Sequence, residues 1–298
     1  MTPPLPDWPG QLIALKNQQV YVRTAPGHGE PALFVHGLGG SSRNWTDLMD
    51  LLRGELACAA VDLPGWGDSP PRPDGRYSIG ALAQTIAALA EQDGPVHLVA
   101  SSLGGAVAVK LAADRPDLVR TLTLISPALP GSRLRRDQAW FPLMSLPRIG
   151  DRLLRRYQVM APEARVADVI GTCFSDPALF PAERFAAEVA ELARRDQLAY
   201  APAALTGAIR ALTAEFVRRT GWRDAARITA PTLVIYGHQD RVVDPRSAGR
   251  AAHAFAAARV VVLPRTGHLA HMEHPAQVAA EIGALLAARR DFPLTPAG

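Results

Sequence analysis

Cysteine is scarce in this sequence, because Cys58 and Cys173 are the only two among its 298 residues. Two cysteines cannot build the disulfide framework that stabilises small secreted proteins. Long apolar runs are lacking too: no stretch approaches the roughly 18 apolar residues that a membrane-spanning helix needs. The first ten residues contain no basic segment followed by an apolar one, so we see no signal peptide. The sequence therefore predicts a soluble, cytoplasmic protein.

Lysine is nearly absent, and arginine supplies almost all of the positive charge. The formal net charge is +4, and its distribution is uneven. Residues 127–228 contain sixteen arginines against eleven acidic residues, whereas the rest of the chain is nearly balanced. The chain has no long run of lysine and arginine of the kind that forms a nucleic-acid-binding stripe. We therefore expect no nucleic-acid partner. Solvated helix surfaces explain the basic segment, and contact with a membrane surface or an anionic substrate is the alternative.

Apolar and charged residues make up 48% and 20% of the chain, which is ordinary for a soluble globular protein. Short apolar runs alternate with amphipathic ones, which predicts an α/β protein whose mostly parallel sheet is covered by helices on both faces. The expected strands are residues 32–35, 58–63, 96–100, 122–125, 232–236 and 260–263, and the expected helices are 44–52, 79–91, 103–113, 247–257 and 275–289.

The segment 128–228 has a different pattern from its surroundings. It is rich in arginine, alanine and proline, has helical spacing and contains no convincing strand. We therefore expect residues 1–127 and 229–298 to form one core and residues 128–228 to form a helical cap, or lid. The cap should cover the carboxyl edge of the sheet, where open α/β sheets bind their ligands.

A candidate nucleophile lies in the motif ASSLG at residues 100–104. The motif follows an expected strand and opens an expected helix, which is the setting of a nucleophile elbow. Ser102 takes the serine position of the pattern G-x-S-x-G, and Ala100 replaces the first glycine by the next smallest residue. Ser101 is the competing choice, but it would place Leu103 where a small residue is needed.

Three further motifs occur in the order that one family requires. HGLGG at residues 36–40 follows a strand, DLPGWGDS at 62–69 follows the next strand, and GHLAHMEHP at 267–275 precedes the last helix. Together with the elbow, these motifs resemble the α/β-hydrolase family, in its serine-nucleophile branch of bacterial carboxylesterases and monoacylglycerol-lipase-like enzymes. The resemblance covers the chain outside the cap. It implies an α/β-hydrolase fold with an oxyanion hole formed by the backbone N–H groups of Leu38 and Leu103.

The remaining members of a catalytic triad should follow later in the chain, in the order serine, acid, histidine. Asp240 fits the family's G-x-x-D acid loop, and Asp244 is the runner-up. Ser126 occupies the alternative acid position of some family members. His268 fits the position of the general base, which would take the proton of the serine and return it to the leaving group.

Other polar residues in these motifs have simpler interpretations. We expect His36 to be structural and Asp62 and Asp68 to shape a turn. HGLGG is a poor phosphate-binding motif, because no Lys-Ser or Lys-Thr follows it. His271 and His274 share a three-residue spacing with His268, but we interpret them as surface residues rather than metal ligands. We expect no metal and no organic cofactor.

A serine at the nucleophile position, with the residues around it, limits which activities of this fold we expect. Haloalkane dehalogenases and epoxide hydrolases of this fold use aspartate at the elbow, and proline iminopeptidases usually carry tryptophan where Leu103 stands. Carbon–carbon hydrolases tend to have an aromatic residue at the position of Leu269. We expect hydrolysis of a small or medium, largely apolar carboxylic ester through an acyl-enzyme. A carbon–carbon hydrolase, a cofactor-free haloperoxidase or perhydrolase, and a non-catalytic ligand-sensing protein remain alternatives.

The cap should determine which substrate is accepted. Its large side chains, at helical spacing, are more typical of a packed interior than of a pocket wall. The candidates for substrate contact are Trp140, Phe141, Met144, Tyr157 and, from the histidine loop, Leu269.

Overall fold

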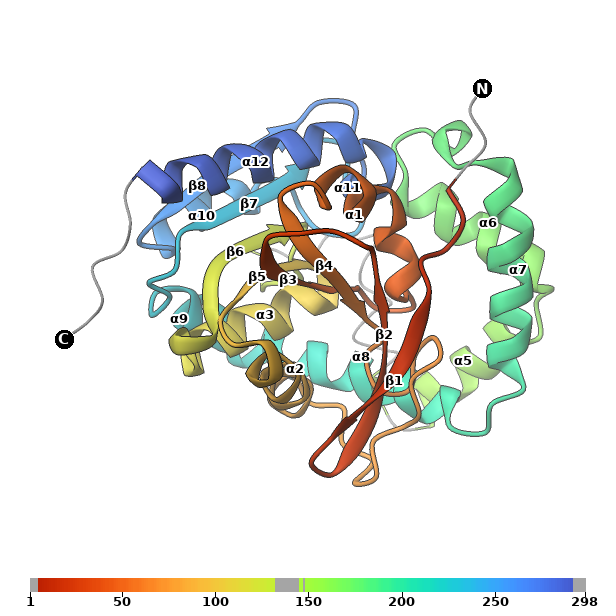
Figure 1. Ribbon diagram of the computed structural model, residues 1–298. Coiled ribbons are helices and arrows are strands. Elements are labelled where there is room, and N and C mark those ends of the chain that lie inside the picture. The colour runs from red at the N-terminus through yellow and green to blue at the C-terminus, as the bar shows by residue number, and fades with distance from the viewer. Residues whose placement is uncertain (1–4, 132–144, 147, 292–298) are drawn as a thin grey trace.

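The computed structural model describes residues 5–131, 145–146 and 148–291. Eight strands from these residues form one sheet, in the order β1-β2-β4-β3-β5-β6-β7-β8 (Figure 1). The strands are β1 Gly10–Leu15, β2 Gln18–Thr24, β3 Glu30–Val35, β4 Leu56–Val61, β5 Val96–Ser101, β6 Val119–Ile125, β7 Thr232–Gly237 and β8 Ala258–Leu263.

The sheet has an antiparallel edge and a parallel centre. Strands β1 and β2 form a hairpin, and β2 runs antiparallel to β4. From β4 to β8 all neighbours are parallel, with Val35 opposite Val61 and Ile125 opposite Ile235. The carboxyl ends of these strands therefore share one edge, which is where parallel sheets carry their functional loops. All six predicted strands are present, although β4 ends at Val61 because the following residues turn.

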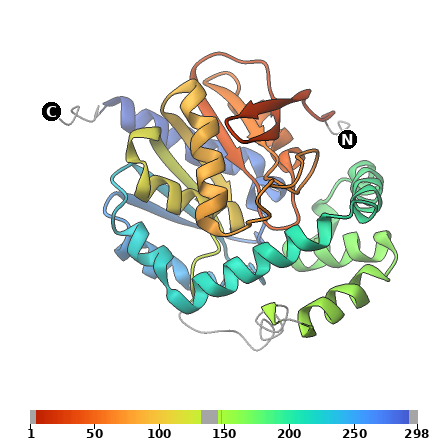
Figure 2. The same ribbon diagram turned by 90° about the horizontal axis from the view of Figure 1, so that it is seen from below.

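Helices cover both faces of the sheet, which confirms the predicted fold class (Figures 1 and 2). On one face, apolar residues of α1 (Thr46–Leu52) and α12 (Pro275–Asp291) join a buried cluster with the sheet. On the other face, a larger cluster includes α2 (Ile79–Asp93), α3 (Ser102–Asp114), α9 (Thr220–Ala225) and α10 (Ser247–Ala254). The remaining short elements of the core are η1 Ser42–Trp45, η2 Pro116–Leu118 and α11 Ala270–Glu273.

Local sequence explains where several of these helices begin and end. Ser78 caps α2, because its side chain accepts a hydrogen bond from the backbone N–H of Ala81. The same helix ends before Gly94, whose φ of 82° suits glycine. Helix α12 begins at Pro275, as predicted, since proline lacks the N–H that a first helical turn leaves unpaired.

The described part of the segment between β6 and β7 contains helices and no strand. They are α5 Ile149–Gln158, α6 Pro162–Cys173, η4 Pro177–Leu179, α7 Ala182–Asp196 and α8 Ala201–Arg218, followed by α9. Helices α5 to α7 lie beside the core, and α8 passes along it toward α9 (Figure 2). Helix α9 packs on α3 in the core layer, although it lies within the range expected to form the cap.

Candidate active site

Ser102 lies at the junction between β5 and α3 and has a φ of 49°. Residues other than glycine rarely adopt this left-handed backbone conformation, and those that do are often found at functional sites. Small neighbours make the turn possible. A Cβ atom on Gly104 would lie 2.4 Å from the carbonyl oxygen of Val35, and one on Gly37 would lie 2.9 Å from the Ser102 Cβ. The glycine loop after β3 thus lies directly against Ser102.

The two residues expected to form an oxyanion hole come from this junction and this loop. Leu103 is buried in the first turn of α3, and Leu38 follows Gly37. The loop turns tightly, since the N–H of Gly40 donates to the carbonyl of Gly37 and Gly39 has a φ of 80°. Backbone N–H groups in the first turn of a helix have no partner within that helix and favour negative charge nearby.

His36 is buried and links two loops. Its Nδ1 lies 2.7 Å from the carbonyl oxygen of Gly37, and its Nε2 accepts a hydrogen bond of 2.9 Å from the N–H of Leu63. Burial lowers the pKa of His36 to about 4, which keeps the ring neutral and able to accept this bond. These contacts confirm the structural interpretation of His36.

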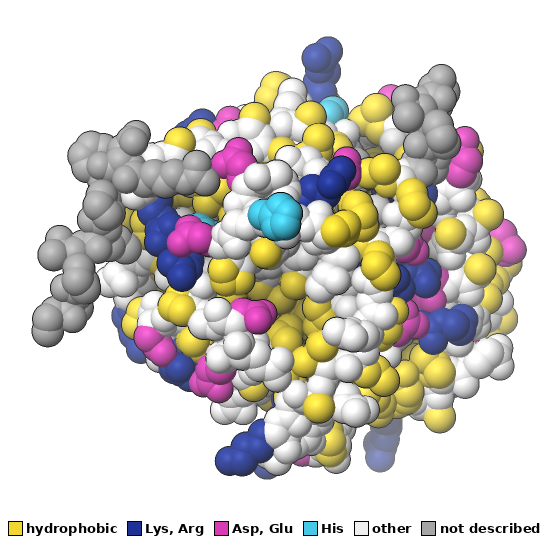
Figure 3. Space-filling view, in the orientation of Figure 1, with side chains coloured by type: hydrophobic (Ala, Val, Ile, Leu, Met, Phe, Trp, Pro, Cys, Tyr) yellow, Lys and Arg dark blue, Asp and Glu magenta, His cyan; other side chains and the backbone are white. Residues whose placement is uncertain are grey.

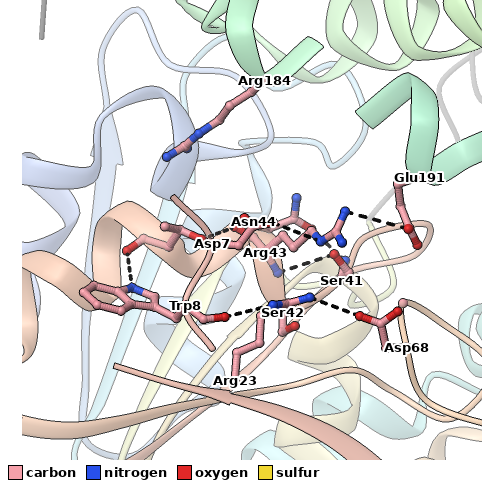
Figure 4. Close-up of polar contacts among 12 residues, drawn as sticks. Asp7, Trp8, Arg23, Ser41, Ser42, Arg43, Asn44, Asp68, Arg184 and Glu191 are labelled. Carbon is pink, nitrogen blue, oxygen red and sulfur yellow. Dashed lines mark hydrogen bonds and ion pairs between the residues drawn. The ribbon is translucent and has the colours of Figure 1, made fainter. Parts of the chain in front are cut away.

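Asp62 shapes the turn after β4, as predicted. Its carboxylate accepts hydrogen bonds from the N–H groups of Ser42, at 2.6 Å, and Asp68, at 2.8 Å. Gly67 has a φ of 52° and passes so close to this carboxylate that a Cβ atom would clash with it. Asp68 forms an ion pair with Arg23 (Figure 4).

Asp240 and His268 meet at the carboxyl edge of the sheet. Both are buried, and His268 Nδ1 lies 2.9 Å from Asp240 Oδ2. The other oxygen, Oδ1, accepts hydrogen bonds from the N–H groups of Val242 and Val243. Burial by itself raises the pKa of Asp240, but the His268 ring and these hydrogen bonds outweigh it and hold the pKa below its usual value. The bond leaves Nε2 of His268 as the nitrogen available to a substrate or a serine.

Asp244, the runner-up acid, has a different partner. The guanidinium of Arg246 donates to its carboxylate: Nη2 lies 2.7 Å from Oδ2, and Nε lies 3.0 Å from each of the two oxygens. The acid loop and the histidine loop approach closely because Gly237 ends β7. A Cβ atom at Gly237 would lie 2.0 Å from the carbonyl oxygen of Gly267.

The prediction that His271 lies at the surface was wrong. His271 is buried, and its ring stacks on Trp45 with centroids 4.2 Å apart. Burial, with a contribution from the charge of His268, lowers the pKa of His271 to about 3. His274 is partly exposed and bonds to the carbonyl of Arg265. Within the described residues, no group of three or more histidine, cysteine, aspartate or glutamate side chains is arranged to hold a metal.

The predicted substrate-contact residues divide into three cases. Trp140, Phe141 and Met144 lie outside the described residues. Tyr157 is half-buried beside the guanidinium of Arg165, 5.8 Å from the ring centroid. Leu269 packs against a small apolar cluster made by Val166, Ile170 and Phe174 of the predicted cap. Leu269 thus lies at the junction of this cluster with the histidine loop, and Tyr157 contacts α6 through Arg165.

Helix α7 contacts the loops around the site in a way that the sequence analysis missed. Arg194 donates to the carbonyl of Gly67 at 2.8 Å, and Arg195 to that of Gly39 at 3.4 Å. Glu191 pairs with Arg43, which follows the glycine loop (Figure 4). No local motif marks these contacts, because they join residues more than a hundred positions apart.

Comparison with known proteins agrees with this geometry. The model of the alpha/beta hydrolase family matches residues 32–281. A pimeloyl-[acyl-carrier protein] methyl ester esterase of Aeromonas salmonicida is 30% identical over 255 residues, which cover 84% of this chain and 93% of that protein. A thermophilic esterase of Thermogutta terrifontis superposes with a TM-score of 0.70 at 23% identity, covering 93% of this chain and 98% of that one. At that identity the likeness concerns the fold alone.

A third relative is much longer than the matched region. A dihydrolipoyllysine-residue acetyltransferase component of the acetoin cleaving system from Cupriavidus necator is 39% identical over 103 residues, which cover 34% of this chain. The chain spans 27% of the length of that relative. In the described residues, no helix is both long and apolar enough to cross a membrane. The family match spans most of the sequence, from β3 to α12, so the chain belongs to the alpha/beta hydrolase family.

Proposed function

We propose that this protein is a serine hydrolase that cleaves a carboxylic ester through an acyl-enzyme, with Ser102 as nucleophile, His268 as general base and Asp240 as the residue that orients His268. The observation that carries the proposal is the buried hydrogen bond of 2.9 Å between His268 and Asp240 at the sheet edge where β5 presents Ser102. The acid, the base and the serine come from loops after three parallel strands, β7, β8 and β5.

Each residue has a chemical task in this mechanism. Asp240 accepts the Nδ1 proton of His268, so Nε2 carries the lone pair that removes the Ser102 proton as Oγ attacks the ester carbonyl carbon. The low pKa of Asp240 keeps its carboxylate ionised beside the imidazolium that then forms. His268 returns the proton to the leaving alcohol, and water later releases the acid by the same route.

The developing negative charge on the carbonyl oxygen needs preorganised donors. We assign this task to the backbone N–H groups of Leu38 and Leu103. The Gly37 loop supports the assignment because it lies against Ser102, and the first turn of α3 adds a favourable field.

The substrate we propose is a small or medium, largely apolar ester, selected by a cap made from the part of residues 128–228 that precedes α9. The names of relatives support ester hydrolysis: one is a methyl ester esterase and another, from Xenopus laevis, is a monoacylglycerol lipase, 28% identical over 258 residues. The buried cluster of Phe174 and its neighbours supports a cap that packs on its own interior and on Leu269.

Contact between the cap and lipid is a further part of the proposal. Most cap arginines on α6 and α7 have acidic or carbonyl partners, and Figure 3 shows both signs of charge side by side over this region. Helix α5 differs, because Arg152 and Arg155 are exposed beside exposed Ile149 and Leu153. Basic and apolar side chains together favour an anionic lipid surface. Co-sedimentation with anionic vesicles at low salt, lost at high salt, is the expected result, and no co-sedimentation would refute it.

The first test is hydrolysis of p-nitrophenyl esters from acetate to palmitate by the wild type, Ser102→Ala and Ser101→Ala. We expect turnover by the wild type and by Ser101→Ala, and loss of about 10⁵-fold or more in Ser102→Ala, as when a triad nucleophile is removed. Equal rates for the wild type and Ser102→Ala would refute the nucleophile. A wild type inactive on every ester would refute ester hydrolysis and favour carbon–carbon hydrolysis, haloperoxidase or perhydrolase chemistry, or ligand sensing.

A further inference from the structure

Glu273 is a buried carboxylate whose two oxygens bind two different parts of the protein. Oε1 accepts a hydrogen bond of 2.7 Å from the N–H of Gly267, the residue before His268. Oε2 accepts hydrogen bonds from the N–H and the Oγ of Ser175, at 2.9 Å and 2.6 Å. A buried carboxylate is costly unless donors satisfy it, and here the donors come from the histidine loop and from the segment after α6.

The same two segments have further contacts. The N–H of His268 donates to the carbonyl of Cys173 at 2.6 Å. The Ser175 Oγ also lies 2.8 Å from the carbonyl oxygen of Arg265, so its single proton is shared between that oxygen and Glu273 Oε2. Gly267 permits this approach, because a Cβ atom there would lie 2.4 Å from the Cys173 oxygen and 2.7 Å from Glu273 Oε1. The backbone next to the proposed base is therefore held between Glu273 and the end of α6.

The acid loop makes a parallel contact with the same helix end. Arg241, which follows Asp240, donates from its guanidinium to the carbonyl of Gly171 at 2.7 Å. The last carbonyl groups of a helix have no partners within it, so α6 receives its final donors from both proposed triad loops. Apolar packing adds to this junction, since Leu269 and Met272 lie against the cluster of Val166, Ile170 and Phe174.

We propose that Glu273 is a positioning residue that couples the docking of α6 to the orientation of His268. The coupling rests on the proposed function, in which His268 must point Nε2 at Ser102 while Nδ1 stays on Asp240. Glu273 fixes the loop one residue before His268 and simultaneously fixes Ser175, so displacement of α6 releases the loop. It follows that the site is fully reactive only when α6 is docked.

The substitution Glu273→Gln separates this role from a general loss of fold. Glutamine has the shape of glutamate, but it places an N–H₂ group where one carboxylate oxygen accepted a hydrogen bond. One of the two segments then loses its acceptor. Ser175→Ala removes only the Oγ contacts, and Glu91→Gln is the matched control, because the Glu91 carboxylate pairs with Arg115 on the surface far from the site.

The primary measurement is kcat on p-nitrophenyl acetate per active site, with sites counted by covalent labelling with a fluorophosphonate. For Glu273→Gln we expect kcat and the labelling rate to fall about 30-fold, within the 100-fold that a 1 Å misplacement costs, with KM changed less than about three-fold. Ser175→Ala should lose about five-fold, and the double variant should lose less than the product of the two single losses, because the two side chains share the contact between Glu273 and Ser175. A purely structural role would lower Tm and the number of labelled sites but leave kcat per labelled site unchanged.

Hydrogen exchange tests the coupling independently of ester hydrolysis. In Glu273→Gln the amides of both residues 170–175 and residues 265–268 should exchange faster than in the wild type, whereas Glu91→Gln should match the wild type. If wild-type Ser102 is neither labelled nor active, the proposed function fails while exchange still decides the coupling. Unchanged exchange in both segments, or wild-type kcat per labelled site in Glu273→Gln, would overturn the proposal.

Discussion

Ser102 and Asp240 illustrate how single residues carry the proposed chemistry. The left-handed conformation of Ser102 costs about 1–2 kcal/mol for a non-glycine residue. The surrounding glycines and the helix that begins there sustain that conformation. Asp240 is held by two backbone N–H groups as well as by His268, so its carboxylate has one fixed direction.

Replacing Asp240 by asparagine tests the orienting role. We expect kcat on p-nitrophenyl esters to fall by about 10³- to 10⁴-fold with little change in KM, because an amide N–H₂ would stabilise the wrong histidine tautomer. Asp244→Asn is the matched control, since that carboxylate binds Arg246 instead, and its kcat should stay within about three-fold. Similar losses in the two variants would contradict the assignment of Asp240.

For single residues, the sequence predicts their place at the ends of strands better than it predicts which side chains they contact. Motif spacing places Asp240 and His268 at the ends of successive strands, and the structure brings them within hydrogen-bonding distance. The pairing of Glu273 with Ser175 was not predictable, because it depends on where α6 docks. The burial of His271 was missed for a related reason: its partner, Trp45, comes from the other half of the chain.

Among the elements, the parallel strands were predictable and the antiparallel edge was not. Central strands are buried on both faces and form continuous apolar runs, such as residues 96–100. Strands β1 and β2 bury little besides Val20 and Val22 on their inner face, so their pattern is weak, and we made no prediction for them. Individual cap helices were not delimited either. Helices α6, α7 and α8 have no side-chain N-caps, and only α6 and α8 have the other local start signal, a proline in the first turn.

The close packing of α3 against β3 can be tested by a substitution that adds one methyl group to a glycine of α3. Gly104→Ala should lower the free energy of unfolding by about 1–3 kcal/mol, because the added Cβ meets the carbonyl oxygens of Val35 and His36 at 2.4 Å and 2.5 Å. Esterase activity should fall with it, since α3 begins at Ser102. Gly283→Ala in α12 is the control: nothing lies within 4 Å of its Cβ, so we expect about 0.5–1 kcal/mol of stabilisation in urea unfolding. Equal stability of the two variants would mean that α3 has room to shift.

For the whole molecule, two buried histidines link stability to pH. His36 and His271 have pKa values of about 4 and about 3, lowered mainly by burial, whereas an unfolded histidine has about 6.5. Between pH 6.5 and 4 the unfolded chain therefore binds protons that the folded chain does not. Stability contributed by these two neutral rings is complete above pH 6.5 and is lost as the pH falls toward their folded values. At about 1.4 kcal/mol per unit of pKa shift, the full loss is on the order of 3 kcal/mol for His36 and on the order of 5 kcal/mol for His271.

His271→Phe isolates one of the two contributions. Phenylalanine can keep the stacking on Trp45, and it removes an Nδ1 atom that has no hydrogen-bond partner among the described residues. We expect the free energy of unfolding at pH 7 to change by less than about 1 kcal/mol, because one unsatisfied polar atom is removed at constant packing. As the pH is lowered from 6 to 4.5, the free energy of unfolding should decrease less steeply than in the wild type. The difference in slope should be about 1.4 kcal/mol per pH unit, which is the contribution of one proton. Urea unfolding at each pH gives both quantities. A wild-type slope in His271→Phe would mean that the unfolded chain does not take up this proton and that stability below pH 6 is limited by other groups.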